Sequence, residues 1–228
     1  MPFDYLQLRC FMEQPVDTVR GSAEMWLDGA YESLLEGGIE AVRILPLSKK
    51  YNLSRTSFYW FFKDREELLS ELLKRWKSKN TGHWIERTQA YADSICEAVL
   101  NVADCWFDET IFDSRFEAAI RNWAQQSAEV AQEMANADAQ RIKALTALFE
   151  RFGFNPTTAD VRARAMYFTQ LGYVSTQPNE EMGLRMSRIA DYVEVFTMVR
   201  PGKHELERFF SRRKAWPTAI PTKKARKK

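Results

Sequence analysis

The chain has 228 residues, of which 45% are hydrophobic and 28% charged, and its formal net charge is +2. This composition supports a sizeable core, and no apolar run approaches the roughly 20 residues that a membrane span requires. The N-terminus MPFDYLQLRC lacks the regions of a signal peptide, and three cysteines without a Cys-x-x-Cys pair argue against a disulfide framework or a zinc site, so we expect a cytoplasmic protein that does not contact membranes.

The first expected elements are short and carry clear boundary signals. After an N-terminal arm (residues 1–20), a helix is predicted over residues 22–36, and Gly37-Gly38 ends it. A short helix follows at 45–51, and Asn52 stands where a left-handed residue is favoured. Ser54 is expected to cap a second short helix that ends near Phe61. Asp64 with Glu67 has the spacing of a capping signature and predicts a longer helix to about residue 76.

No stretch in the rest of the chain alternates apolar and polar residues with period 2, so its patterns favour helices over strands. Helices are predicted over 84–103, 114–126 and 128–152, then from a cap at Thr157 or Thr158 to 175, then over 180–199, with a short one after Pro201. The sequence therefore predicts an all-α protein.

The C-terminal end has a different charge from the rest. From Arg212 onward there are eight basic residues and no acidic one, which leaves 25 basic against 31 acidic residues in the body. We expect residues 212–228 to form a disordered basic tail, with the alternative that the tail is an arm contacting phosphates.

Two short helices joined by a tight turn and preceded by a packing helix form a helix-turn-helix unit. In such a unit the second helix enters the major groove of DNA, so its exposed side chains are polar or basic. Phe58 and Phe62 are four residues apart and are expected in the core. The candidate DNA-binding residues are Arg43, Ser54, Arg55, Thr56, Ser57, Tyr59, Trp60 and Lys63. A helical hairpin within the core is the alternative interpretation.

The segment PLSKKYNLSRTSFYWFFKDREELL (46–69) resembles the DNA-binding signature of the TetR family of bacterial transcriptional regulators. Asn52-Leu53-Ser54 corresponds to the family's turn, residues 58–62 to its aromatic stretch, and residues 63–68 to the start of the next helix. Asn52 replaces the usual Gly, and Phe61 replaces the usual His. The resemblance implies a helix-turn-helix domain at 21–66 and a larger helical ligand-binding and dimerisation domain at 67–211.

That resemblance also implies a homodimer and a small-molecule effector. Helices 158–175 and 180–199 would pair with their copies, through the residues Ala159, Ala163, Met166, Leu171, Gly172, Val193 and Phe196. An aromatic-lined cavity suits an apolar or aromatic ligand. The candidate ligand-binding residues are Trp106, Phe116, Trp123 and Tyr167, although most aromatic rings of the body are expected to be ordinary core.

The acids Asp104, Asp108, Glu109, Asp113 and Glu117 are interpreted as a solvated helix face, with a site for a cationic ligand or metal as the alternative. Two isolated histidines support neither a metal site nor a catalytic triad, and no cofactor motif is present. We therefore expect a non-enzymatic, homodimeric repressor that a small molecule releases from a palindromic operator in double-stranded DNA. The alternative is an all-α enzyme or a small-molecule-binding protein with no role at DNA.

Overall fold

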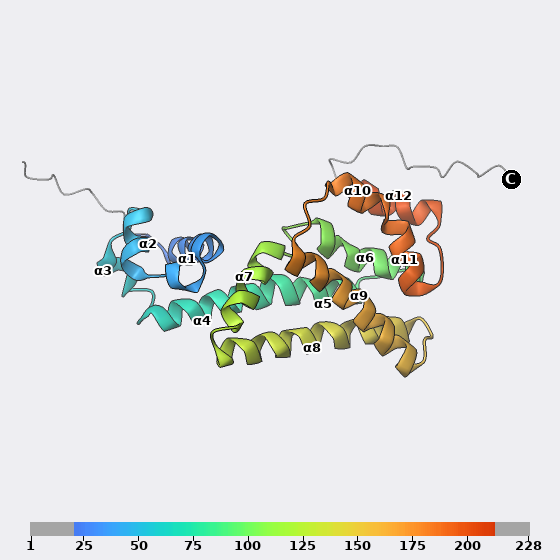
Figure 1. Cartoon of the computed structure of the whole chain (residues 1–228), viewed down its shortest axis with the longest axis horizontal. Helices are drawn as coiled ribbons and strands as arrows, with labels where there is room; N and C mark the ends of the chain where they lie inside the picture. Colours follow the sequence, from blue (N-terminus) through green and yellow to red (C-terminus); the bar gives the residue numbers. More distant parts are fainter. Residues whose placement is uncertain (1–20, 213–228) are drawn as a thin grey trace, which may run out of the picture.

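The computed structural model describes residues 21–212, and every regular element in this range is helical (Figure 1). The expected all-α fold is confirmed. The N-terminal arm and the basic tail after Arg212 lie outside the described residues. No helix within the described range is long and apolar enough to cross a membrane.

The elements follow one another along the chain with short connections. In order they are α1 (Ala23–Gly37), the 3-10 helix η1 (Ile39–Ala41), α2 (Ile44–Lys50), α3 (Arg55–Phe58), α4 (Arg65–Trp76), the π-helix η2 (Lys77–Gly82), α5 (His83–Gln89), α6 (Ile95–Phe107), α7 (Ser114–Ala124), α8 (Ala128–Arg151), α9 (Pro156–Thr176), α10 (Met182–Ser187), α11 (Ile189–Thr197) and α12 (Lys203–Ser211). We call α1 to α4 with η1 the N-terminal bundle, and η2 to α12 the helical body.

Local capping chemistry explains the boundaries in the N-terminal bundle. The Ser22 side chain accepts from the backbone N–H of Met25 at 3.2 Å, and Asp64 accepts from that of Glu67 at 2.9 Å. Asn52 has a φ of 52°, the left-handed conformation predicted for it. The prediction that the Ser54 side chain caps α3 is wrong, because that side chain makes no cap hydrogen bond.

In the helical body several predicted helices are divided. The helix expected at 84–103 is broken between α5 and α6, where Ser94 accepts from the backbone N–H of Glu97 at 3.1 Å and starts a new helix. The helix expected at 180–199 is two shorter ones, α10 and α11. The cap of α9 is Asn155 rather than Thr157 or Thr158, since Pro156 occupies the first turn.

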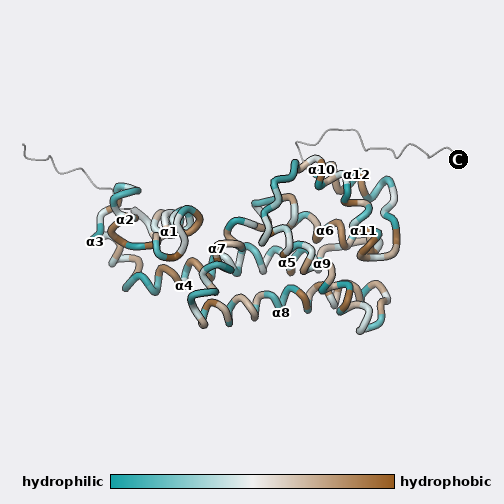
Figure 2. The backbone as a smooth tube through the Cα atoms, in the orientation of Figure 1, coloured by the Kyte–Doolittle hydropathy of each residue, from teal (hydrophilic) through white to brown (hydrophobic). Residues whose placement is uncertain are grey.

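Two hydrophobic clusters form the core. One joins the inner faces of the N-terminal bundle to α7 and the start of α8, and Trp26, Phe58 and Trp76 are fully buried in it. The other lies in the helical body around α6, where Figure 2 shows hydrophobic residues along the chain. The boundary expected between residues 66 and 67 falls within α4, so side chains on both sides of it share one cluster.

The molecule is elongated, with the N-terminal bundle at one end and the helical body at the other (Figure 1). The α4–η2–α5 segment runs from the bundle into the body, and α8 and α9 pack against each other along the body. The turn between α2 and α3 is thereby placed at the outer end of the molecule.

Candidate nucleic-acid interface

The turn between α2 and α3 has a backbone conformation that its sequence favours. Left-handed Asn52 reverses the chain, and the backbone N–H of Leu53 donates to the Ser48 carbonyl at 2.9 Å. Gly29 in α1 permits close packing, because a Cβ atom at that position would lie 2.9 Å from the Tyr51 ring. The two short helices are therefore held against α1.

The helix α3 has only four residues, too short to be stable alone. Tertiary packing holds it in place: Phe58 is fully buried and meets Trp26 edge-on, with 5.1 Å between ring centroids. Phe62 lies 5.4 Å from Phe58, also between centroids. Both phenylalanines are in the core, as predicted, and they anchor the helix from its inner side.

Arg65 at the start of α4 braces the other side of the unit. Its guanidinium donates to the backbone carbonyl of Val42 at 2.6 Å and to that of Ile39 at 2.8 Å. These bonds join α4 to the loop that leads into α2, so the α2–α3 unit is attached to α4 as well as to α1.

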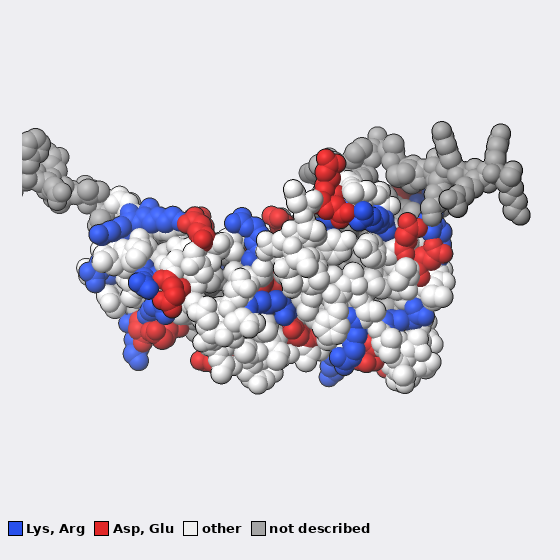
Figure 3. Space-filling model, in the orientation of Figure 1, with Lys and Arg blue, Asp and Glu red and all other residues white. Residues whose placement is uncertain are grey.

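The opposite side of α3 is open to solvent. Tyr59 and Trp60 are 57% and 53% exposed, which is unusual for large aromatic side chains. The other predicted contact residues that lie exposed are Arg43, Arg55, Thr56 and Lys63. Ser54 is half-buried. Figure 3 shows basic side chains at this end of the molecule, where a duplex would meet them.

Ser57 requires a correction. Its side chain is 1% exposed, and its hydroxyl donates to the Ser54 carbonyl at 2.7 Å. Because its side chain is buried and its hydroxyl donates within the turn, Ser57 does not face DNA. Its role is to stabilise the turn.

Lys49 is a basic residue at this end of the molecule that is not among the predicted DNA-binding residues. It lies exposed in the last turn of α2, with no ion pair to any described residue. The neighbouring Lys50 instead pairs with Glu36 at 2.5 Å, and Arg43 pairs with Glu40 at 2.9 Å. Exposed pairs of this kind are weak, so a phosphate can replace the carboxylate. The sequence signal that could have predicted this residue was the Lys49-Lys50 pair at the end of the first short helix.

The four predicted ligand-binding residues do not line one cavity. Phe116 packs edge-on against Tyr31 at 5.0 Å between centroids, and Trp123 borders a groove near η1. The Tyr167 hydroxyl belongs to a buried polar cluster. Trp106 lies beside a different pocket, within the helical body, together with Phe107, Thr169, Gln170, Tyr173, Arg185 and Tyr192.

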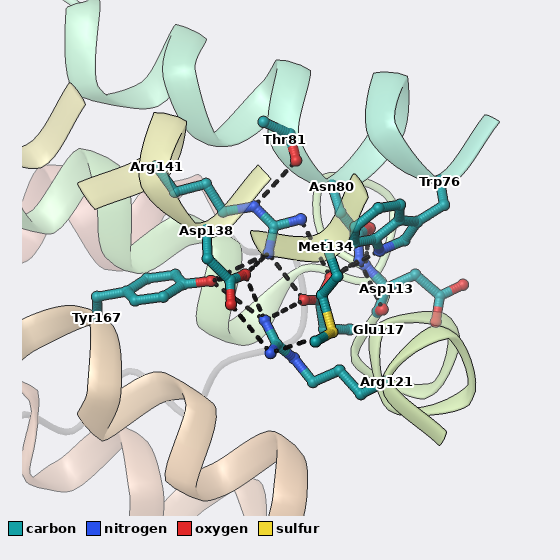
Figure 4. Close-up of polar contacts among 10 residues, drawn as sticks. All are labelled: Trp76, Asn80, Thr81, Asp113, Glu117, Arg121, Met134, Asp138, Arg141 and Tyr167. Carbon is teal, nitrogen blue, oxygen red and sulfur yellow. Dashed lines mark hydrogen bonds and ion pairs between the residues drawn. The ribbon is translucent and has the colours of Figure 1, made fainter. Parts of the chain in front are cut away.

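The buried polar cluster lies where α4 and η2 meet α7, α8 and α9 (Figure 4). At its centre the fully buried Glu117 carboxylate accepts from Arg141 at 2.8 Å and from Arg121 at 2.8 Å. Glu117 also accepts from the Trp76 indole at 2.7 Å and from the Asn80 amide at 2.9 Å. All four groups donate to the Glu117 carboxylate and compensate its negative charge, which would be costly to bury alone.

Two further acids complete this arrangement. Asp138 accepts from Arg121 at 2.6 Å and from the Tyr167 hydroxyl at 2.6 Å. Asp113 caps α7 and accepts from the Tyr31 hydroxyl of α1 at 2.6 Å. Through these hydrogen bonds the cluster, together with Asp113, connects the N-terminal bundle to the helical body.

The prediction of a solvated acidic face is wrong for three of its five members. Asp104, Asp113 and Glu117 are buried. Burial by itself raises the pKa of Glu117, but the charges of Arg141 and Arg121 and the hydrogen bonds from Arg141 and Asn80 outweigh it and lower the pKa to about 2. Glu117 is thus an anion at neutral pH despite its complete burial.

The residues predicted for dimerisation point largely inward. Ala159, Ala163 and Met166 have no exposed surface, and Val193 and Phe196 are buried with them in the body cluster. Other side chains of the same two helical segments are exposed instead. On α9 they are Val161, Ala165 and Phe168, and at α11 they are Val195 with the following Met198 and Val199; of the predicted residues, Gly172 is exposed as well and Leu171 is half-buried.

Comparison with known proteins places the N-terminal bundle in a family. Residues 27–72 match the family described as bacterial regulatory proteins, tetR family. This range contains the whole segment 46–69 from which the resemblance was drawn, and the resemblance is confirmed. A search of curated proteins gives no match.

Solved structures resemble most of the chain in fold. A protein described as a transcriptional regulator from Streptomyces coelicolor A3(2) is 16% identical with a TM-score of 0.54, over 77% of this chain and 98% of that one. A transcriptional regulator from Rhodococcus sp. Rha1 is 16% identical with a TM-score of 0.55, over 86% of this chain and 100% of that one. The helical body therefore shares its fold with proteins of known structure that carry this description.

Proposed function

We propose that this chain, a transcriptional regulator of the TetR type, is a homodimeric cytoplasmic repressor that a small molecule releases from a palindromic operator. One observation carries the DNA-reading part of the proposal. A four-residue helix is anchored by buried phenylalanines on one side and presents Arg55, Thr56 and Tyr59 to solvent on the other.

The exposed side chains divide by what they reach in a DNA complex. Arg55 and Thr56, at the N-terminal end of α3, meet base edges in the major groove. Tyr59, Lys63 and Lys49 contact phosphates, and Arg43 joins them once a phosphate replaces Glu40. Phosphate contacts set the register of the protein on the duplex, whereas base contacts select the sequence.

The dimer surface in this proposal is the exposed side of α9. Val161, Ala165, Phe168 and Gly172 follow one another at spacings of four, three and four residues, so they form one stripe along the helix. Phe168 is 54% exposed at its middle, and exposed apolar patches of this kind mark interfaces. A two-fold dimer presents two copies of α3 to successive major grooves, which requires a palindromic operator.

The buried polar cluster supplies the connection that release from DNA needs. It joins the α4–η2 segment to α7, α8 and α9 through charges that are satisfied only in a particular packing. A ligand that favours another packing of the body changes the position of α4, and with it the spacing of the two α3 helices. Release requires that the ligand prefers this second state, since equal affinity for both states shifts nothing.

The test is selection of binding sites by the purified protein from a library of random DNA duplexes. The proposal expects enriched sequences with two-fold symmetry and half-sites about one helical turn apart. The variant Phe168→Glu, measured by light scattering, is expected to be monomeric and to select no palindrome. Absence of any enriched sequence from the wild-type selection contradicts the proposed function.

A further inference from the structure

The pocket beside Trp106 contains an arginine whose surroundings are unusual. The Arg185 guanidinium of α10 lies 4.3 Å from the ring centroid of Tyr173 and 5.6 Å from that of Phe107. It forms no ion pair with any acid of residues 21–212. A cation stacked on two rings and lacking a carboxylate partner is suited to an anion that arrives from outside.

Most of the remaining walls of this pocket are aromatic, and Thr169 and Gln170 complete them. Trp106 meets Tyr192 edge-on at 6.5 Å between centroids, and the Tyr173 and Tyr192 hydroxyl oxygens are 3.0 Å apart. Within the described residues the indole Nε1 of Trp106 is buried without a hydrogen-bond partner. A buried donor of this kind is costly to leave unpaired, so an oxygen acceptor on a ligand would satisfy it.

The pocket is nearly closed in this conformation. The space between its side chains is about 10 Å³, roughly enough for one water molecule. An open groove of about 800 Å³ adjoins it and shares Thr169 and Tyr173 with it. The far wall of that groove is formed by Leu184 of α10 and residues 178–181 that precede this helix. A ligand therefore enters from the groove, and it fits only after α10 moves outward with Arg185.

From these observations we propose that the pocket binds an aromatic carboxylate, with the carboxylate on Arg185 and the ring among Trp106, Tyr173 and Tyr192. Guanidinium and carboxylate match in a bidentate geometry, and the aromatic walls accept a planar ring. The inference rests on the proposed function in one respect, because it makes this molecule the effector. The closed pocket agrees with that role, since binding selects a conformer other than the one described.

The direct test is calorimetric titration of the full chain without DNA. Phenylacetate is compared with 2-phenylethanol, which keeps the ring and loses the charge, and with acetate, which keeps the charge and loses the ring. We expect phenylacetate to bind at least about tenfold more tightly than 2-phenylethanol and acetate not to bind. Equal affinity for phenylacetate and 2-phenylethanol, or no binding of phenylacetate at millimolar concentration, overturns the proposal.

Variants then assign the charge to one residue. Arg185→Gln is expected to lower the phenylacetate affinity to that of 2-phenylethanol. The matched control is Arg151→Gln, because Arg151 also lies over a ring, 5.3 Å from that of Phe152, but outside the pocket; it should leave the affinity unchanged. Wild-type affinity in a folded Arg185→Gln protein overturns the role of Arg185.

The wild-type protein in the duplex selection separates the two proposals. A wild type that binds no phenylacetate but still selects a palindrome refutes the pocket inference alone. Ligand binding in a protein that selects no DNA sequence refutes the proposed function and leaves the pocket as a binding site.

Discussion

Two arginines of the N-terminal bundle and one of the helical body have opposite surroundings. In the N-terminal bundle Arg55 is exposed, and within residues 21–212 Arg43 pairs only with the exposed Glu40. In the helical body Arg141 is fully buried and donates to Glu117, Thr81 and the Tyr167 hydroxyl. An exposed cation is weakly held and can exchange its partner for a phosphate. A buried cation is stable only with all its partners, so the same residue type has an external role at one end and an internal one at the other.

The largest expected effect comes from removing the buried arginine of this comparison, Arg141. Arg141→Ala leaves Glu117 buried without its main counter-charge, and we expect a loss of about 3–5 kcal/mol in the free energy of unfolding. Urea unfolding followed by circular dichroism measures it. The control is Arg164→Ala, which removes the exposed pair with Asp160 and should cause no measurable change. Equal stability of the two variants would show that the cluster does not hold the body together.

The second effect is a pH dependence with a defined sign. The pKa of Glu117 is lowered to about 2 from an ordinary 4.5, so its stabilising contribution is present above pH 4.5 and disappears as the pH falls toward 2. The full contribution corresponds to about 3 kcal/mol. The difference in unfolding free energy between wild type and Glu117→Gln should therefore be largest above pH 5 and shrink in acid. A difference independent of pH would mean that the Glu117 charge is not stabilised by its partners.

The third effect concerns the external side. Arg55→Ala should weaken binding to the selected operator by about 1–3 kcal/mol and relax the sequence preference, while its unfolding free energy stays within about 0.5 kcal/mol of wild type. Fluorescence anisotropy with operator and mutated duplexes measures the first quantity, and urea unfolding the second. A large loss of stability in this variant would remove the distinction between external and internal arginines.

The smallest expected effect is at Phe61, where the family usually has His. This side chain is 38% exposed, so Phe61→His should change stability by less than about 0.5 kcal/mol. An imidazole N–H can donate to a phosphate, and we expect a modest gain in DNA affinity in the same anisotropy assay. An unchanged affinity places Phe61 away from the duplex.

The predictability of the two regions also differs, and for a physical reason. The N-terminal bundle depends on local signals: Ser22 and Asp64 cap helices, and Asn52 takes the left-handed conformation. Such signals lie within a few residues of the boundary they set, so the sequence reveals them. Ser57 shows their limit, because only the folded turn buries its hydroxyl.

The helical body depends on contacts between distant residues. Glu117 meets Trp76 and Asn80, which are 41 and 37 residues away in the chain, and no local pattern distinguishes it from a solvated acid. The break between α5 and α6 was open to prediction, because Ser94 and Glu97 have the capping spacing used elsewhere in the chain. The apolar pattern of that segment hid the signal.

The sequence predicted the type of side chain at the pocket, but not which residues line it. Aromatic residues were expected to line it, and Trp106 does. Phe116, Trp123 and Tyr167 were equally aromatic but belong to other surroundings, since residue type alone does not tell a core ring from a pocket wall. Arg185 had no signal in the sequence, because its stacking on Tyr173 depends on the angle between α9 and α10.

The central claim is that the exposed cations of the N-terminal bundle bind DNA. The most direct measurement is the salt dependence of binding to a duplex of random sequence, for the wild type and for the double variant Lys49→Gln/Lys63→Gln. Because each lost phosphate contact lowers the slope of log K against log salt by about 1, we predict a slope smaller by about 2. The body variant Arg164→Gln should keep the wild-type slope. An unchanged slope in the double variant would contradict the account.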